Sequence, residues 1–282
     1  MRKDNIAVFF PKNLNDLLSI YSSNPEAEIL AGALEFMNNS NVTQIKKIIS
    51  ITSVSELKKV HRTDKYIDLG AATTISQILR IGQYVIPPIL YNALKSIGSP
   101  SIRNIATIGG NILQSSIISN SLPVLCALNA GFELRNLSKS RWLPASQFIT
   151  NDKKNILNKD EVLVRIRIPL TFWHTQIFKK VTLKSNIYPA QLIFCGLAHI
   201  AKSIISDMKI VLGRPNKSLF RNRSIETYLI GKKLPISDKD IKQLTEILDD
   251  TLEQVEDTDE KEFYLRNTTI RLIVNFFKEL KQ

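Results

Sequence analysis

The chain has 282 residues, 44% of them hydrophobic, and a formal net charge of +12 at pH 7. This length and composition are typical of one or two globular domains with a substantial core. No apolar run approaches the length of a membrane span, and the short apolar run before Pro11 is not expected to be a signal peptide. We therefore expect a cytoplasmic protein that has no membrane partner.

The positive charge is spread along the chain in pairs such as Lys46-Lys47 and Lys232-Lys233. No zinc pattern and no motif of interleaved aromatic and basic residues accompanies these pairs. Scattered charge of this kind favours a solvated basic surface, which could meet an acidic partner, and we expect no nucleic acid. Nucleic-acid binding stays a weaker alternative that rests on net charge alone, and salt-dependent retention on DNA would test it.

Apolar periodicity predicts the elements of the first half of the chain. Residues 1–60 combine short strands with a helix around Leu17 and Leu18, and a strand leads into Gly32. A strand over 66–69 meets Gly70, after which Thr73 or Thr74 can N-cap a helix. A further helix begins near Pro88 and ends at Gly98, because proline suits a first helical turn and glycine a helix end.

The second half begins with a buried helix that changes to a strand around Gly131. In residues 162–168, the apolar residues at 162, 164, 166 and 168 alternate with a second set, Leu163, Arg165 and Arg167. This pattern predicts a strand with one buried face that stops at Pro169. Near residue 172 the pattern changes to several strands, a helix closed at Gly231, and two helices after Ser237. A boundary between two parts of the chain is therefore expected near residue 172.

Few side chains stand out as candidates for chemistry. Cys126 and Cys195 lie in apolar runs and are interpreted as buried small hydrophobes in a reducing compartment. Two cysteines cannot hold even one iron–sulfur cluster of the Cys₄ kind. The histidines, His61, His174 and His199, are widely separated and show no ligand spacing, and His199 is interpreted as a satisfied core residue. We expect no catalytic residue and no metal ligand in this chain.

Two adjacent glycines, Gly109 and Gly110, mark the segment SIRNIATIGGNILQSS, residues 101–116, in a chain with only ten glycines. Glycine allows positive φ and lets another group approach the backbone closely. Consecutive N–H groups can form a concavity for an anion, to which Thr107 and Asn111 would add hydrogen-bonding groups. A tight turn between buried segments is the alternative, and neither GxxxxGK[ST] nor GxGxxG is present.

Residues 103–111 resemble the Arg-Asn-x-Ala-Thr-x-Gly-Gly-Asn run of the second flavin-binding loop in the FAD-binding (medium) subunits of molybdenum hydroxylases. That family includes xanthine dehydrogenase and carbon monoxide dehydrogenase. Other segments resemble it in the expected order, namely ILAGALEFM for the first flavin loop, IDLGAATTISQI between the loops, LNKDEVLVRIRIP at the end of the flavin domain, and FKKVTLK and EFYLRNTTIRLIV in the C-terminal domain. The similarity spans nearly the whole chain.

The resemblance implies an α+β fold that begins with a PCMH-type FAD-binding domain over 1–172, made of two α/β subdomains at about 1–60 and 61–172. A C-terminal domain of antiparallel sheet and helices would follow over 173–282. It implies an oxidoreductase subunit that carries FAD, takes electrons from [2Fe–2S] clusters on a small subunit and passes them to NAD or another acceptor. The hydroxylation would occur on a molybdopterin-binding large subunit, so this chain would not be active alone.

The resemblance also implies a set of cofactor-binding residues. The FAD diphosphate would lie between the two loops, held by main-chain N–H groups and hydroxyls. Ile97 would lie near the flavin or adenine, Leu163 near the adenine and Asn120 near the ribose, and Lys180 would lie close to the flavin ring, where a cation favours an anionic reduced flavin. The loop residues so implied are Ala31, Gly32, Ala33, Leu34 and Glu35 in the first loop and Thr107, Gly109, Gly110 and Asn111 in the second.

Four residues depart from the family pattern. Ala33-Leu34 replaces Gly-Thr or Asn-Thr, so Ala33 places a Cβ where the backbone needs positive φ and Leu34 lacks the hydroxyl of threonine. Asn120 replaces a carboxylate, and Lys184 replaces an arginine that would form a planar fork. Two hypotheses therefore stay open, a working flavoprotein and a degenerate member with weak or no FAD binding that acts as a scaffold subunit.

Overall fold

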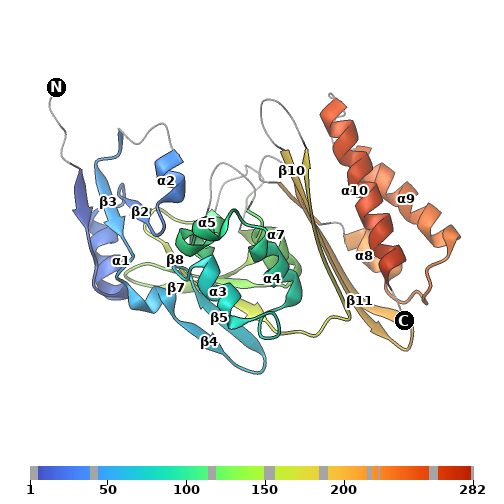
Figure 1. Ribbon diagram of the computed structural model, residues 1–282, viewed down its shortest axis with the longest axis horizontal. Helices are drawn as coiled ribbons and strands as arrows, with labels where there is room; N and C mark the ends of the chain where they lie inside the picture. Colours follow the sequence, from blue (N-terminus) through green and yellow to red (C-terminus); the bar gives the residue numbers. More distant parts are fainter. Residues whose placement is uncertain are drawn as a thin grey trace. The chain divides into compact units, whose positions relative to one another are not determined.

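The computed structural model describes residues 6–38, 44–113, 119–148, 156–183, 190–214, 218–221, 223–253 and 260–280. The chain divides into two compact units, Met1–Thr171 and Phe172–Gln282. In Figure 1 the first unit runs from blue to yellow and the second from yellow to red. Each unit is built on β-sheet, with helices packed against the strands.

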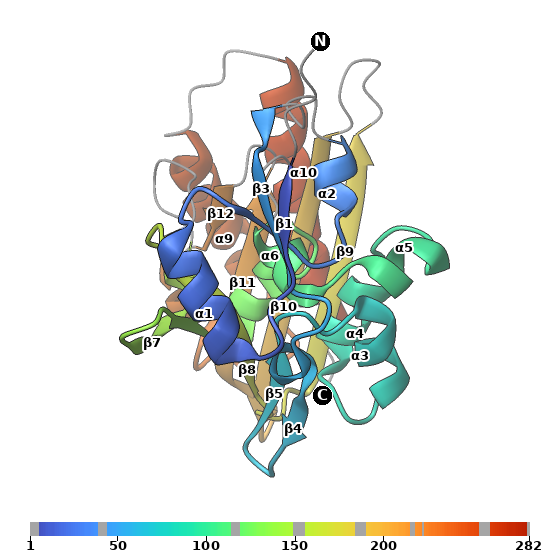
Figure 2. The same ribbon diagram turned by 90° about the vertical axis from the view of Figure 1, so that its left-hand side faces the viewer.

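The first unit begins with a small parallel sheet. Its strands are β1 (Ala7–Phe9), β2 (Glu28–Leu30) and β3 (Lys47–Ser50), in the order β1-β3-β2. Helix α1 (Leu14–Ser23) starts where the Asn13 side chain accepts the N–H of Asp16. Figure 2 shows α1 beside these strands, and its apolar face is buried because Leu14, Leu17 and Leu18 belong to one core with Ile49.

The rest of the first unit is organised by a five-stranded antiparallel sheet with the order β4-β5-β8-β6-β7. Strand β8 lies at its centre, and its alternating pattern buries Val162, Val164, Ile166 and Ile168 on one face as the sequence predicts. Val162 and Val164 share a core with α1, so the two sheets are packed as one body. The strands are β4 (Val60–Arg62), β5 (Tyr66–Gly70), β6 (Gly131–Arg135), β7 (Ser140–Pro144) and β8 (Val162–Pro169).

A series of short helices connects β5 to β6. Thr74 begins α3 with a capping box, in which its hydroxyl accepts the N–H of Gln77 while the Gln77 side chain accepts the N–H of Thr74. Pro88 opens α4, and Gly98 beyond it has a φ of +45°. The helices are α3 (Ile75–Ile81), α4 (Pro88–Lys95), α5 (Pro100–Ile105), α6 (Ile108–Leu113) and α7 (Leu122–Ala127).

Two buried carboxylates tie the five-stranded sheet together. Asp68 on β5 accepts both arms of the Arg167 guanidinium from β8, each at 2.8 Å. Glu161, whose side chain is 1% exposed, accepts Nε and Nη2 of Arg141, each at 2.7 Å, and also the N–H of Asn158. These bonds, led by the Arg141 fork, lower the pKa of Glu161 to about 2.

In the described part of the second unit, an antiparallel sheet of four strands has the order β12-β11-β10-β9 and packs with three helices. The helices bury their apolar faces with Phe194 and other residues of β10 and β11. A Cβ at Gly196 on β10 would lie 2.7 Å from the ring of Phe276 on α10. Helix α10 therefore packs directly on strand β10. The elements are β9 (Thr175–Leu183), β10 (Ala190–Ala201), β11 (Ile204–Arg214), β12 (Ser218–Phe220), α8 (Arg223–Leu229), α9 (Asp238–Glu253) and α10 (Glu260–Glu279).

The depressed pKa of Glu161 predicts an acid-sensitive contribution to stability. The ionised form is favoured by folding, so this contribution is complete above the ordinary glutamate pKa and is lost as pH falls toward about 2. Glu161→Gln should lower the free energy of unfolding at neutral pH by about 2 kcal/mol and flatten its fall with acid. Urea denaturation of the full chain from neutral to acid pH measures both effects.

The matched control is Glu246→Gln, on the exposed side of α9. It should leave both the neutral stability and its pH dependence close to those of the wild type. Equal pH profiles for Glu161→Gln and the wild type would contradict the assignment of acid sensitivity to Glu161.

Candidate functional site

The two glycine-bearing loops meet in the first unit. A Cβ added at Gly32 would lie 2.2 Å from the carbonyl oxygen of Ile105, which ends α5 two residues before Thr107. Atoms at that separation overlap, so only glycine lets the first loop approach the second this closely. The structure therefore brings together two segments that lie far apart in the sequence.

The first loop carries backbone strain. Ala33 has a φ of +56°, in the left-handed region that an alanine occupies at a cost. Its carbonyl oxygen accepts the N–H of Met37 at 3.0 Å, so α2 (Leu34–Asn38) begins directly after it. Leu34 and Glu35 lie in the first turn of that helix, both half-buried. The positive φ expected at position 33 is thus present, although the residue is not glycine.

In the second loop the main-chain N–H groups are used within the chain. Gly109 donates to the carbonyl oxygen of Ala71 at 2.8 Å, Gly110 donates to Oγ1 of Thr107 at 3.1 Å, and Asn111 donates to the carbonyl oxygen of Thr107 at 2.9 Å. A Cβ at Gly109 would lie 2.7 Å from the oxygen of Ala71. Gly109 is therefore required by this close approach, and the N–H groups expected at the diphosphate are those that fold the loop.

Polar side chains surround the second loop instead. Oγ of Ser121 donates to Oδ1 of Asn111 at 2.7 Å, and Nδ2 of Asn120 donates to Oγ of Ser96 at 3.1 Å. Ser121 and Asn120 are buried, and Asn111 is half-buried. Ser115 and Ser116 of the same segment lie outside the described residues. The loop thus presents asparagine side chains that are held by neighbouring serines.

Arg103 has a role that the sequence analysis did not assign. Its Nη1 lies 3.2, 2.9 and 2.7 Å from the carbonyl oxygens of Lys95, Ile97 and Gly98. These carbonyls follow the end of α4, where helix geometry leaves them without partners. Arg103 therefore fixes the turn before α5, and the arginine of the family run has a structural function. Its only sequence signal was its place in that run.

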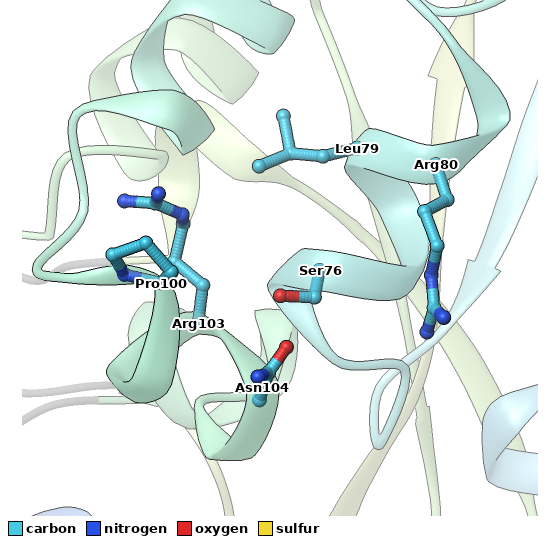
Figure 3. A pocket seen from close by; sticks show the side chains of 6 residues that line it. All are labelled: Ser76, Leu79, Arg80, Pro100, Arg103 and Asn104. Atoms are coloured by element: carbon cyan, nitrogen blue, oxygen red, sulfur yellow. The ribbon is translucent and has the colours of Figure 1, made fainter.

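A surface hollow of about 330 Å³ lies between α3 and α5. Figure 3 shows Ser76 and Leu79 on one side and Arg103 and Asn104 on the other, with Arg80 extending away from them. No residue predicted for flavin binding is among its lining residues, which are Ser76, Leu79, Arg80, Pro100, Arg103 and Asn104. The hollow therefore lies beside the run 103–111, to which Arg103 and Asn104 belong, but is not lined by the residues predicted to bind FAD.

The remaining predicted residues lie in different surroundings. Ile97 is buried next to Ser96, and Leu163 is buried on β8, the strand against which α6 packs. Lys180 belongs to the second unit, on β9, where burial lowers the pKa of its amine. Lys184 lies outside the described residues.

Two histidines that are distant in sequence are neighbours in the structure. Antiparallel pairing of β9 with β10 brings the rings of His174 and His199 to 4.7 Å. Nδ1 of His174 accepts the N–H of Ile200, and Nδ1 of His199 lies 2.7 Å from Oγ of Ser206. His199 is half-buried rather than a core residue. No cluster of three metal-ligating side chains occurs among the described residues.

Comparison with known proteins identifies the class of protein that this geometry belongs to. Residues 4–171 match the family model described as the FAD binding domain in molybdopterin dehydrogenase. The match covers more than half of the chain, and the chain therefore belongs to this family. The resemblance given by the loops, the α+β fold, the oxidoreductase class and FAD as the cofactor of the family are confirmed.

Relatives and solved structures extend this likeness beyond the matched domain. The chain is 28% identical to the glyceraldehyde dehydrogenase medium chain of Sulfolobus acidocaldarius over 95% of its own length and 96% of that protein. It is 30% identical to a xanthine dehydrogenase FAD-binding subunit of Escherichia coli O157:H7 over 55% of each chain. It spans only 18% of the xanthine dehydrogenase of Oryza sativa, at 28% identity.

Two solved structures share the fold over both units. A chain of the carbon monoxide dehydrogenase from Hydrogenophaga pseudoflava matches 96% of this chain with a TM-score of 0.79 at 20% identity. A chain of quinoline 2-oxidoreductase from Pseudomonas putida 86 matches 99% with a TM-score of 0.80 at 18% identity. In the part of the chain that the structure describes, no helix combines the length and apolar character needed to cross a membrane.

The strain at Ala33 gives a testable prediction. Ala33→Gly removes the steric cost of the left-handed backbone and should raise the free energy of unfolding by about 0.5–1 kcal/mol, after the entropy that glycine adds to the unfolded chain. Ala31→Gly is the matched control in the same loop, where φ is not positive, and it should lower stability by a similar amount. Urea denaturation of both variants tests this, and a destabilised Ala33→Gly would contradict it.

Proposed function

We propose that this chain is the FAD-carrying electron-transfer subunit of a molybdenum hydroxylase complex. It would take electrons from [2Fe–2S] clusters on a small subunit and pass them to NAD or another acceptor. The observation that carries the proposal is the contact of Gly32 with the Ile105 carbonyl, because it sets the two loops of a family defined by FAD binding against each other. The substrate chemistry would belong to a molybdopterin-binding large subunit in the cytoplasm.

The residues present fit a dinucleotide diphosphate between the loops. Gly32 and Gly109 form close contacts that any side chain would block. Among the described residues, a Cβ at exposed Gly110 would meet only Oγ1 of Thr107 within 4 Å. Asn111 and Asn120 supply polar groups beside them. Ala31, Ala33, Leu34 and Glu35 from the first loop and Thr107 from the second would line the same region, and Ile97 and Leu163 would contact the cofactor rings.

Bound FAD would supply the reversible oxidation and reduction that this role needs. The chain's own contribution is to bind and orient the cofactor and to adjust the charge around it. Lys180 would adjust this charge, because a cation close to a flavin ring stabilises negative charge on that ring. The chain has two cysteines in all, so the clusters would have to be held by a partner.

The alternative is a scaffold subunit with weak or no FAD binding. The observation that favours it is the positive φ of Ala33, followed by Leu34, which has no hydroxyl for phosphate. Both features weaken the first loop without touching the second. The second loop also supports the proposal of a flavoprotein, because residues 103–111 match every specified position of the family run.

The visible spectrum of the purified full chain separates these two functions. A flavoprotein should show the absorption of oxidised flavin on purification or after addition of FAD and gel filtration. Leu34→Thr, which restores a hydroxyl, should tighten FAD binding by about tenfold, the effect of one hydrogen bond. A chain that stays colourless with added FAD, in wild type and Leu34→Thr alike, would overturn the flavoprotein and favour the scaffold.

The charge of Lys180 predicts an effect on the reduction potential of the bound FAD. Lys180→Met should lower the potential by about 30 mV, which is about 1.4 kcal/mol for a two-electron couple. Because burial lowers the pKa of Lys180, its charge is lost earlier as pH rises, and the difference should shrink at alkaline pH. Lys179→Met is the control, since Lys179 is the exposed neighbour on β9. Equal potentials in the wild type and Lys180→Met would contradict this role.

A further inference from the structure

Two asparagines of the second loop region are each held in one orientation by a serine. Asn111 follows the glycine pair, and Asn120 precedes α7. An asparagine side chain can donate through Nδ2 or accept through Oδ1, and its hydrogen bonds decide which of the two is left for a ligand. The serines that make these bonds are Ser121 and Ser96.

The orientation of Asn111 follows from a chain of hydroxyls. Oγ of Ser121 donates its one proton to Oδ1 of Asn111 at 2.7 Å. The 3.2 Å contact between Ser119 and Ser121 must then be donated by Ser119, whose oxygen accepts the N–H of Leu122 at 2.9 Å. Oδ1 of Asn111 is therefore directed to Ser121. Nδ2 makes no hydrogen bond to another residue that the structure describes, so Nδ2 is the group that we assign to a ligand.

Asn120 is held the opposite way round. The hydroxyl of Ser96 donates to the carbonyl oxygen of Ala93 at 2.7 Å, so its oxygen can only accept from Asn120. Nδ2 of Asn120 lies 3.1 Å from that oxygen and 3.4 Å from the carbonyl oxygen of Ser96. Both contacts require a donor, so Nδ2 is directed to Ser96. Oδ1, an acceptor, has no partner among the described residues and is the group that we assign to a ligand.

We propose that Ser121 and Ser96 are positioning residues that give the two asparagines opposite polarity toward FAD. Asn111 would donate to a diphosphate oxygen, and Asn120 would accept from a ribose hydroxyl. The inference rests on the proposed function and deepens it. It also explains how the second loop recognises an anion although the N–H groups of Gly109, Gly110 and Asn111 donate within the chain.

This arrangement changes the meaning of Asn120. The family pattern has a carboxylate at this position, so from the sequence alone the amide is expected to lack a charge-assisted acceptor. A carboxylate at 120 would face two acceptor oxygens of Ser96, and the one Ser96 proton is already committed to Ala93. Asn120 and Ser96 are therefore a matched pair, in which the amide fits the hydroxyl orientation that Ser96 has in this structure.

A double-mutant cycle on the full chain tests the role of Ser121. FAD is titrated into flavin-free protein, and the dissociation constant is measured for Ser121→Ala, Asn111→Ala and both together. Ser121→Ala should weaken FAD binding about tenfold, as expected for one hydrogen bond. In the Asn111→Ala background the same change should have no further effect, because Ser121 acts through Asn111. Ser121→Thr, which keeps a hydroxyl, should restore binding.

Charge variants test the two polarities. Asn111→Asp keeps an acceptor for Ser121 but replaces the donor by a negative charge, and it should weaken FAD binding about 100-fold. Asn120→Asp should also weaken binding, by about tenfold, although it restores the family residue. Ser23→Ala is the control, since that hydroxyl donates to Ser19 at the end of α1, and its FAD affinity should equal that of the wild type.

The outcomes separate this inference from the proposed function. Wild-type protein that binds FAD, with additive effects of Ser121→Ala and Asn111→Ala or with tighter binding by Asn120→Asp, would overturn the inference alone. Wild-type protein that binds no FAD would overturn both. Thermal unfolding of each flavin-free variant identifies any that fails to fold, and the isosteric Asn111→Asp then decides the role of Asn111 without cavity formation.

Discussion

The contact between Gly32 and the carbonyl of Ile105 is the constraint on which the site depends. Any side chain at position 32 would overlap that oxygen, so the distance between the two loops is set by the absence of a Cβ. A second contact of the same kind, between Gly109 and Ala71, seats the second loop on the end of β5. Both contacts join backbone to backbone, which makes the site insensitive to rotamer changes but sensitive to displacement of the strands.

The strands are held in place by packing and by buried ion pairs. Val162 and Val164 of the central strand pack in the same core as α1, so the parallel sheet that carries the first loop cannot move freely against the antiparallel sheet. Asp68 and Glu161, each held by an arginine fork, tie the antiparallel sheet across its strands. Buried carboxylates of this kind contribute only while they are paired and ionised.

The backbones of the two loops are held in different ways. The second loop uses its N–H groups to close its own turn, and the side chains of Asn111 and Asn120 are held by serines. The first loop keeps a left-handed backbone at Ala33, which costs about 1 kcal/mol or more. The cost is small compared with the stability of a domain, so a strained first loop is compatible with a folded protein.

Local features of this molecule could be predicted from the sequence. The alternation in β8 and the proline that opens α4 were evident in contiguous residues. The need for positive φ at position 33 could also be predicted, from the family pattern. The choice between Thr73 and Thr74 as the cap of α3 was open, and the structure decides for Thr74 because Gln77 completes a capping box with it.

The sequence by itself determined the helices, strands and caps, because these are properties of neighbouring residues, and its contiguous motifs carried the resemblance to the family and to its two loops. Only the tertiary structure decided which hydrogen bonds the residues of the second loop make within the chain. Gly109 donates to Ala71, Arg103 binds the carbonyls beyond α4, Ser96 orients Asn120, and strand pairing brings His174 to His199. Hydrogen-bond partners that are remote in the chain leave no local pattern, so their allocation follows from packing alone.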